Sequence, residues 1–309
     1  NAGRAVETDD GYVLTFRQRI YDHYTTSLAT LKAAVRNRQQ LLDYFADARN
    51  PAETKTVETE AYLFPDDGGE GYLYDVVEML RRHGVEVERT TESFETSAMD
   101  YRDGERERQR FASGTMVVRA DQPEHLFINS ILQRTVAFQD SVMYDMSTWS
   151  APLAYNLEAY STEQDVDVAT ETLQDDPVPP AGVVNPDARY AYVIDWNQRH
   201  APRALAKLWD LGYRVRSARK PFDTGTRAFS RGTLIVLRGR NPDKQDPAAD
   251  MERVARETGV RIHGLDTGRM EEGIDLASRN SRVVDEPKTA LLVDQPFSTY
   301  TSGQIWYLF

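Results

Sequence analysis

The sequence predicts an α/β protein built from two homologous halves with mostly parallel sheets, preceded by a long N-terminal helix. Three observations lead to this fold class. Strand, helix and strand patterns follow one another along the chain, the same order of patterns occurs twice, and a long apolar stripe with helical spacing lies near the N-terminus.

The first half begins with a clear strand–helix–strand pattern. Ala61–Phe64 is a short apolar run that predicts a buried strand. Apolar residues with helical spacing follow over residues 72–80, and Gly84 is a typical C-terminal cap. Val85–Val87 then begins the next strand. A helix that connects two strands is the unit from which parallel sheets are built, so we expect a parallel sheet here.

The same patterns occur again in the second part of the chain, in the same order. The matching pairs of segments are 61–64 with 191–194, 80–87 with 208–215, 94–96 with 222–224, and 111–118 with 229–236. Four matches in one order are hardly a chance result. We therefore infer two homologous halves, residues 56–165 and 189–309, joined by an acidic, proline-rich linker at residues 166–188.

Residues 1–55 predict a helical lead. Apolar residues from Ile20 to Phe45 recur at intervals of three, four and seven, which gives one stripe along a helix over residues 15–48. Asn50-Pro51 ends this helix. A stripe of this length needs a partner surface. The chain ends on the apolar run Trp306–Phe309 inside a predicted helix, so we expect it to be truncated there.

Composition excludes several classes of function. The chain has 309 residues, and 37 Lys+Arg against 49 Asp+Glu give a formal net charge of -12. This acidic balance argues against a nucleic-acid partner, which requires a basic surface. The sequence holds no apolar run long enough for a membrane span. Because cysteine is absent, disulfides, Cys-ligated metals and thiol nucleophiles are excluded.

His83-Gly84-Val85-Glu86 has the H-x-x-E spacing that gives a metal two ligands, and His200 is a candidate third ligand. An active metallopeptidase that uses these residues is one hypothesis. The repeat favours a structural interpretation, because it aligns His83 with Leu211 at the end of an amphipathic helix. The charged run Arg102–Arg108 is typical of a solvated loop.

A small-ligand-binding module is the alternative function. Asp66, Asp195 and Asp294 each follow a predicted strand, and parallel sheets bind ligands in crevices at the carboxyl ends of their strands. Three acids at such an edge suit a sugar or a cationic metabolite. The segment 144–154 is rich in aromatic and polar groups, and it adds the candidate ligand-binding residues Tyr144, Asp145 and Trp149.

Several segments resemble the C-terminal part of large bacterial zinc carboxypeptidases of the carboxypeptidase A-like metallopeptidase family. The resemblance covers most of the chain. It is carried by the segments Ala2–Gly11, Leu14–Ile20, Thr25–Leu28, Tyr144–Ala154 and Gly303–Phe309. Tyr144–Ala154 is the most specific of these matches.

The resemblance implies a class I glutamine amidotransferase-like fold, which is a flavodoxin-like, three-layer α/β sandwich, in each half. It also implies a secreted or periplasmic parent protein. The family's zinc ligands and catalytic glutamate lie upstream of the matched segments, and the amidotransferase cysteine has no counterpart here. We therefore expect a non-catalytic accessory region without a cofactor of its own. Its partners would be the upstream zinc-containing catalytic domain and peptide or carbohydrate material.

Overall fold

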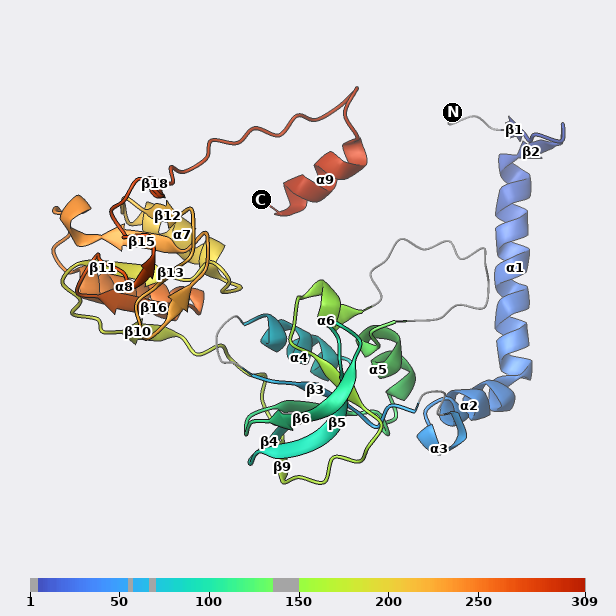
Figure 1. Cartoon of the computed structure of the whole chain (residues 1–309). Coiled ribbons are helices and arrows are strands. Elements are labelled where there is room, and N and C mark those ends of the chain that lie inside the picture. Colours follow the sequence, from blue (N-terminus) through green and yellow to red (C-terminus); the bar gives the residue numbers. More distant parts are fainter. Residues whose placement is uncertain (1–4, 55–57, 67–70, 136–149, 309) are drawn as a thin grey trace. The chain divides into compact units, whose positions relative to one another are not determined.

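The structure, a computed structural model, describes residues 5–54, 58–66, 71–135 and 150–308. The chain divides into two compact units (Figure 1). The first unit comprises residues 1–65 and 79–173, and the second comprises residues 66–78 and 174–309. Helix α4 (Tyr72–Arg82) contains the point of division between residues 78 and 79.

The chain begins with a short hairpin followed by helix α1 (Phe16–Arg36). Strands β1 (Ala5–Glu7) and β2 (Val13–Thr15) pair antiparallel. The last residue of β2 caps the helix, since the Thr15 hydroxyl accepts a hydrogen bond of 3.1 Å from the amide of Gln18. Such a cap satisfies one of the free amides of the first helical turn.

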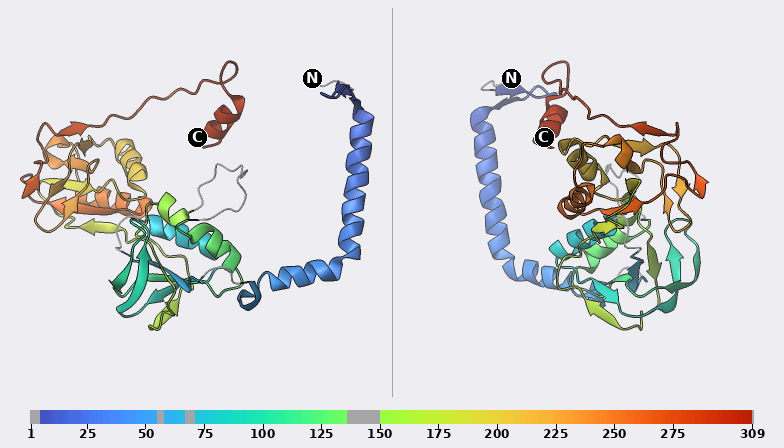
Figure 2. Two further views of the ribbon diagram at one scale, coloured as in Figure 1. Left: turned by 45° about the vertical axis from the view of Figure 1, so that its right-hand side comes forward. Right: turned by 90° about the vertical axis from the view of Figure 1, so that its left-hand side faces the viewer.

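The predicted helix over residues 15–48 is interrupted. Helix α1 ends at Asn37, and α2 (Arg38–Asp47) starts directly after it. The bend between them is visible in both views of Figure 2. A short helix, α3 (Pro51–Thr54), follows. No residue of α1 or α2 is buried, although both helices carry large apolar side chains.

The first unit holds a seven-stranded sheet whose described ladders are all antiparallel. In spatial order its strands are β6 (Arg106–Phe111), β5 (Phe94–Asp100), β8 (Tyr160–Thr162), β3 (Ala61–Phe64), β7 (Met116–Arg119), β4 (Glu88–Thr90) and β9 (Thr170–Thr172). Its remaining described helices are α5 (His125–Leu132) and α6 (Ala151–Ala154).

The second unit holds a six-stranded sheet and a small three-stranded sheet. The six strands are β10 (Gly182–Val184), β16 (Arg261–Leu265), β11 (Ala191–Ile194), β15 (Leu234–Leu237), β12 (Arg216–Ala218) and β18 (Ser281–Val283). The small sheet comprises β14 (Ala228–Phe229), β13 (Phe222–Asp223) and β17 (Glu272–Gly273). The helical elements are α7 (Ala201–Asp210), η1 (Arg238–Arg240), α8 (Pro247–Thr258) and α9 (Thr299–Leu308).

The two units repeat one arrangement of five strands. The order β8-β3-β7-β4-β9 in the first unit corresponds to β16-β11-β15-β12-β18 in the second. The central ladders also share their register: Phe64 lies opposite Met116, and Ile194 lies opposite Leu234. These four residues occupy matching positions in the sequence repeat, so the structure shows the same repeat as the sequence.

The turns before β7 and β15 are also built alike. The amide of Gly114 donates to the carbonyl of Thr90 at 2.8 Å, and the amide of Gly232 donates to the carbonyl of Ala218 at 2.8 Å. The two glycines have φ angles of 96° and 97°. Only glycine adopts such a backbone without strain, which explains why both copies of the turn carry glycine here.

In each unit, three rings pack between a hairpin and the strands of the main sheet. The hairpin is β5–β6 in the first unit and β13–β14 in the second. The rings are Phe94, Phe111 and Tyr160 in the first unit, and Phe222, Phe229 and His263 in the second. The central ring lies 5.2 and 5.1 Å from its neighbours in the first unit, and 5.0 and 5.5 Å in the second. The hairpin therefore covers the same face of the sheet in both units.

In the second unit, both faces of the six-stranded sheet are buried. Tyr192 and Ile194 pack with α7 and α8, whereas Val193 packs with the residues of the small sheet. Successive side chains of a strand point to opposite faces, so β11 contributes to both cores. In the first unit the equivalent hairpin, β5–β6, is joined to the main sheet through β8, and the sheet curls over its own core (Figure 1).

The predicted fold class is wrong. The sheets are mostly antiparallel, and among the described strands only β10 and β16 pair in parallel, so the units are not flavodoxin-like or amidotransferase-like. The pattern β3–α4–β4 is present, but β7 lies between β3 and β4 and runs antiparallel to both. This is a split β-α-β arrangement, in which a later strand inserts between the two strands that the helix connects. The strand expected at residues 289–293 is not formed.

We predict that Gly114→Ala destabilises the first unit by about 1–2 kcal/mol, because its φ is positive. No atom lies within 4 Å of an added Cβ, so the whole cost comes from the backbone conformation. Gly232→Ala should cost more, since its Cβ would also lie 2.9 Å from the Trp196 ring. Gly239→Ala, without a positive φ or a close neighbour, is the matched control. Urea unfolding measures the differences, and equal effects at Gly114 and Gly239 would contradict the turn geometry.

Candidate functional site

A pocket of about 380 Å³ lies in the first unit beside β4 and β7, and we call it the Arg119 pocket. Its lining residues come from two stretches of the chain: residues 84–88, which run into β4, and residues 119–124, which connect the end of β7 to α5. They are Gly84, Glu86, Glu88, Arg119, Asp121, Gln122, Pro123 and Glu124.

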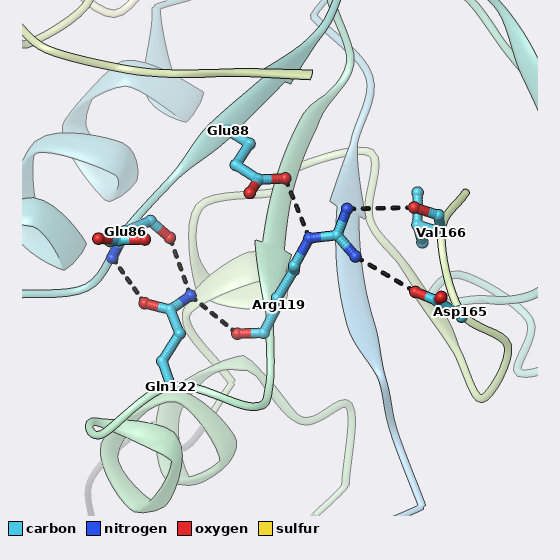
Figure 3. Close-up of polar contacts among 6 residues, drawn as sticks. All are labelled: Glu86, Glu88, Arg119, Gln122, Asp165 and Val166. Carbon is cyan, nitrogen blue, oxygen red and sulfur yellow. Dashed lines mark hydrogen bonds and ion pairs between the residues drawn. The ribbon is translucent and has the colours of Figure 1, made fainter. Parts of the chain in front are cut away.

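Arg119, the last residue of β7, has three polar partners (Figure 3). Its Nε donates to Glu88 Oε2 at 3.1 Å, its Nη1 to Asp165 Oδ1 at 3.3 Å, and its Nη2 to the carbonyl of Val166 at 3.1 Å. Hydrogen bonds between charged partners are among the stronger ones in proteins. The guanidinium is therefore held in one orientation, and two carboxylates offset its charge.

Gln122 connects two parts of the pocket through its carboxamide (Figure 3). Its Oε1 accepts from the amide of Glu86 at 2.7 Å. Its Nε2 donates to the carbonyls of Glu86 and Arg119 at 3.0 and 2.9 Å. One side chain thus holds the segment before β4 against the end of β7.

Asn241 makes the same three bonds in the second unit. Its Oδ1 accepts from the amide of Arg214 at 2.7 Å, and its Nδ2 donates to the carbonyls of Arg214 and Leu237 at 3.3 and 2.9 Å. The repeat aligns Arg214 with Glu86 and Leu237 with Arg119. Because both units contain this connection, we attribute it to the fold and not to a function of the first unit.

The ion pairs of the pocket are particular to the first unit. The register of the repeat places Leu237 at the position of Arg119 and Arg216 at the position of Glu88. The second unit therefore keeps the backbone arrangement and lacks this charge network. The charged side chains are for that reason the candidate functional part of the pocket.

The remaining charges of the pocket are negative. Glu88 and Asp165 bind Arg119. The other acidic residues of the lining are Glu86, Asp121 and Glu124. Glu124 lies 4.0 Å from the guanidinium of Arg49, which is a long ion pair. Several carboxylates around one concave surface favour the binding of a cation.

The structure places the three predicted ligand-binding acids in separate local contacts. Asp66 accepts from the Tyr74 hydroxyl at 3.0 and 2.8 Å. Asp195 accepts from the Ser230 hydroxyl, and Asp294 accepts from the amide of its own neighbour in the chain. The crevice predicted at the carboxyl ends of parallel strands is not formed, because neighbouring strands in these sheets run mostly in opposite directions. Tyr144, Asp145 and Trp149 lie outside the described residues.

The candidate zinc ligands have other surroundings. The His83 ring lies 4.5 Å from the ring of Phe127, and the backbone of Glu86 binds Gln122. His200 is the N-cap residue of α7 in the second unit. Within the described ranges, no three His, Asp or Glu side chains form a group that could hold a metal ion.

His263 has a perturbed environment in the second unit. Its ring packs edge-on against Phe229, and its Nε2 is buried without a hydrogen-bond partner in the described part of the chain. Burial, and next the charge of Arg227, lower the pKa of His263 to about 4. The imidazole is therefore neutral in the folded protein near pH 7.

Arg119 is not among the candidate residues predicted from the sequence. A signal for it was available in the repeat, because one copy has arginine where the other has leucine at the end of the same strand. Comparison of the two copies at each aligned position would have separated shared structural residues from charges found in one unit.

No family model, no curated protein and no solved structure matches this chain. Among the helices of the described ranges, none is long and apolar enough to cross a membrane.

We predict that the second unit loses stability as the pH falls from about 6.5 towards 4. The unfolded chain binds a proton at His263 near its ordinary pKa of 6.5, whereas the folded chain resists it until about 4, so acid favours unfolding. We expect His263→Phe, which keeps a ring against Phe229, to reduce this loss by about 2 kcal/mol. Thermal unfolding across this pH range measures it, and identical pH profiles for both proteins would contradict the prediction.

Proposed function

We propose that this chain is a non-catalytic accessory region that docks on the catalytic domain of a zinc carboxypeptidase through α1 and α2. The observation that carries the proposal is a long apolar stripe on these two helices. Its exposed members are Phe16, Ile20, Tyr24, Leu31, Val35, Leu42 and Phe45.

The exposure of this stripe is large for apolar side chains. Ile20 is 55% exposed, Leu31 is 63% exposed and Val35 is 76% exposed. Single exposed apolar residues are common, but a contiguous apolar patch on a protein surface usually marks an interaction site. Burial of each such side chain against a partner stabilises the complex by roughly 1.5–3 kcal/mol at most.

The resemblance of the sequence supports the choice of partner. The segments Leu14–Ile20 and Thr25–Leu28, which lie mostly in α1, resemble the region just after the catalytic glutamate of the zinc carboxypeptidases. A secreted or periplasmic location follows from the same resemblance. In this proposal the catalytic domain supplies the zinc, and the chain described here supplies a docking surface.

The test is hydrogen exchange on α1, measured on the chain alone and on the chain with such a catalytic domain joined ahead of it. We expect at least roughly tenfold slower exchange in α1 when the domain is present, because docking removes its amides from water and suppresses local opening. Leu31→Glu should abolish this protection. Lys32→Glu, the next residue on the helix, changes a charge without removing an apolar contact and is the control.

Unchanged exchange in the joined protein would contradict docking. Protection that persists in Leu31→Glu would show that another surface makes the contact.

A second function, the binding of a small cationic ligand, is favoured by the charges of the Arg119 pocket. Glu86, Asp121 and Glu124 line the pocket, while the positive charge of Arg119 is already paired with Glu88 and Asp165. An ammonium or guanidinium group would gain hydrogen bonds to these carboxylates.

For this second function we predict that spermidine or free arginine binds the chain and that Asp121→Asn weakens binding by about tenfold, which is about 1.4 kcal/mol. Asp103→Asn removes an exposed acid outside the pocket and should have no effect. Titration calorimetry at low salt measures both variants. Equal losses in the two variants would indicate general electrostatic attraction instead of a site.

A further inference from the structure

A second pocket of the first unit has a different chemical character. It has a volume of about 470 Å³ and lies beside β3, β5 and β8. We call it the Tyr62 pocket. Its lining residues are Glu58, Thr59, Tyr62, Met99, Tyr101, Gly104, Gln133, Arg134, Thr135, Ser161 and Glu163.

Two buried tyrosines form part of the pocket wall. Tyr62 is 1% exposed and Tyr101 is 2% exposed. The Tyr62 hydroxyl donates to Asn129 Oδ1 at 2.7 Å, and the Tyr101 hydroxyl donates to the carbonyl of Leu132 at 2.6 Å. Both hydroxyl protons are therefore committed to the protein, so the oxygens can offer only lone pairs to a ligand. Burial raises the pKa of both groups, which keeps them neutral.

The charges of the pocket nearly balance. Glu163 is paired with Arg106 at 2.6 Å, which leaves Glu58 and Arg134 as lining charges of opposite sign. The Nε of Arg134 donates to the carbonyl of Tyr101 at 3.0 Å, so its guanidinium is fixed in place. An ion of either sign would gain little net attraction here, and the pocket therefore suits a neutral ligand.

The lining groups both accept and donate. Glu58 accepts hydrogen bonds and Arg134 donates them, while the hydroxyls of Thr59 and Ser161 bond to Tyr62 and Tyr101 and keep lone pairs that can accept. A ligand that matches this surface must carry donors and acceptors side by side. Each hydroxyl of a polyol is both, whereas an ammonium or a carboxylate provides only one kind.

Among the described residues of the second unit, the matching position is filled by the protein itself. The repeat places Gly264 at the position of Ser161 and Tyr192 at that of Tyr62. A Cβ at Gly264 would lie 2.0 Å from the carbonyl oxygen of Asn185, and the Tyr192 hydroxyl donates to the carbonyl of Pro186 at 2.5 Å. Backbone of the second unit itself thus fills this space.

We propose that the Tyr62 pocket binds one neutral, hydroxyl-rich ligand of about the size of a sugar ring. The inference stands on the two buried tyrosines of the wall, the balanced charges and the mixed donors and acceptors of the lining. It does not depend on docking through α1 and α2, nor on a cation in the Arg119 pocket. In the described part of the second unit the equivalent space is filled, so the repeat does not provide a second copy of this site.

The test is a titration monitored by NMR of the methionine methyl groups. Met99 lines the pocket, and Met251, which is buried in the second unit, is an internal control. The probes are glucose, N-acetylglucosamine and maltose, each added up to tens of millimolar because single-site sugar affinities are commonly weak. We expect at least one probe to shift the Met99 signal saturably with one site per chain and to leave Met251 unchanged.

Two exposed glutamates of the first unit provide matched variants. Glu58→Gln alters the pocket lining and should weaken binding about tenfold, whereas Glu171→Gln lies on β9, away from the lining residues, and should not. The proposal is overturned if none of the three sugars moves Met99, or if Glu58→Gln binds as well as the unaltered chain. A shift of Met99 with spermidine but with no sugar would also overturn it, because the ligand would then be a cation.

Discussion

The antiparallel ladder at the centre of each unit determines the rest of the structure. Strands β3 and β11 are buried over their full length, and each pairs on both sides with an antiparallel strand. A shift of one residue would move every side chain of these strands to the opposite face of the sheet. The fixed register therefore decides which residues meet the helices and which meet the hairpin.

The repeat gives each unit an internal comparison. Gln122 and Asn241 make the same three hydrogen bonds, and Gly114 and Gly232 form the same turn. Contacts present in both units are explained by the fold. Contacts present in one unit require another reason, and Arg119 in the first unit is the clearest case.

Part of the fold could be predicted from the sequence because it depends on local patterns. The strand Ala61–Phe64, the helix that ends before Gly84 and the repeat itself are encoded in short-range spacing and in glycine. The direction of strand pairing could not be predicted in this way. It depends on the insertion of β7 between β3 and β4, which is a long-range contact.

The charged run Arg102–Arg108 shows a second limit. We expected a solvated loop, but Arg106 begins strand β6 at the edge of the sheet. Charged residues are common on edge strands because they oppose pairing with other chains, so charge alone does not separate an edge strand from a loop. The Arg119 pocket was missed because its lining residues come from two segments, 84–88 and 119–124, that lie far apart in the sequence.

Paired cysteines can test the antiparallel register of the central ladder in the first unit. The chain has no cysteine of its own, so any disulfide must come from the introduced pair. Leu63 lies directly opposite Val117, a separation that a disulfide can span, and Val118 points to the other face. We expect Leu63→Cys with Val117→Cys to form a disulfide on mild oxidation and Leu63→Cys with Val118→Cys to remain reduced. The reverse result, or equal oxidation of both pairs, would contradict the register.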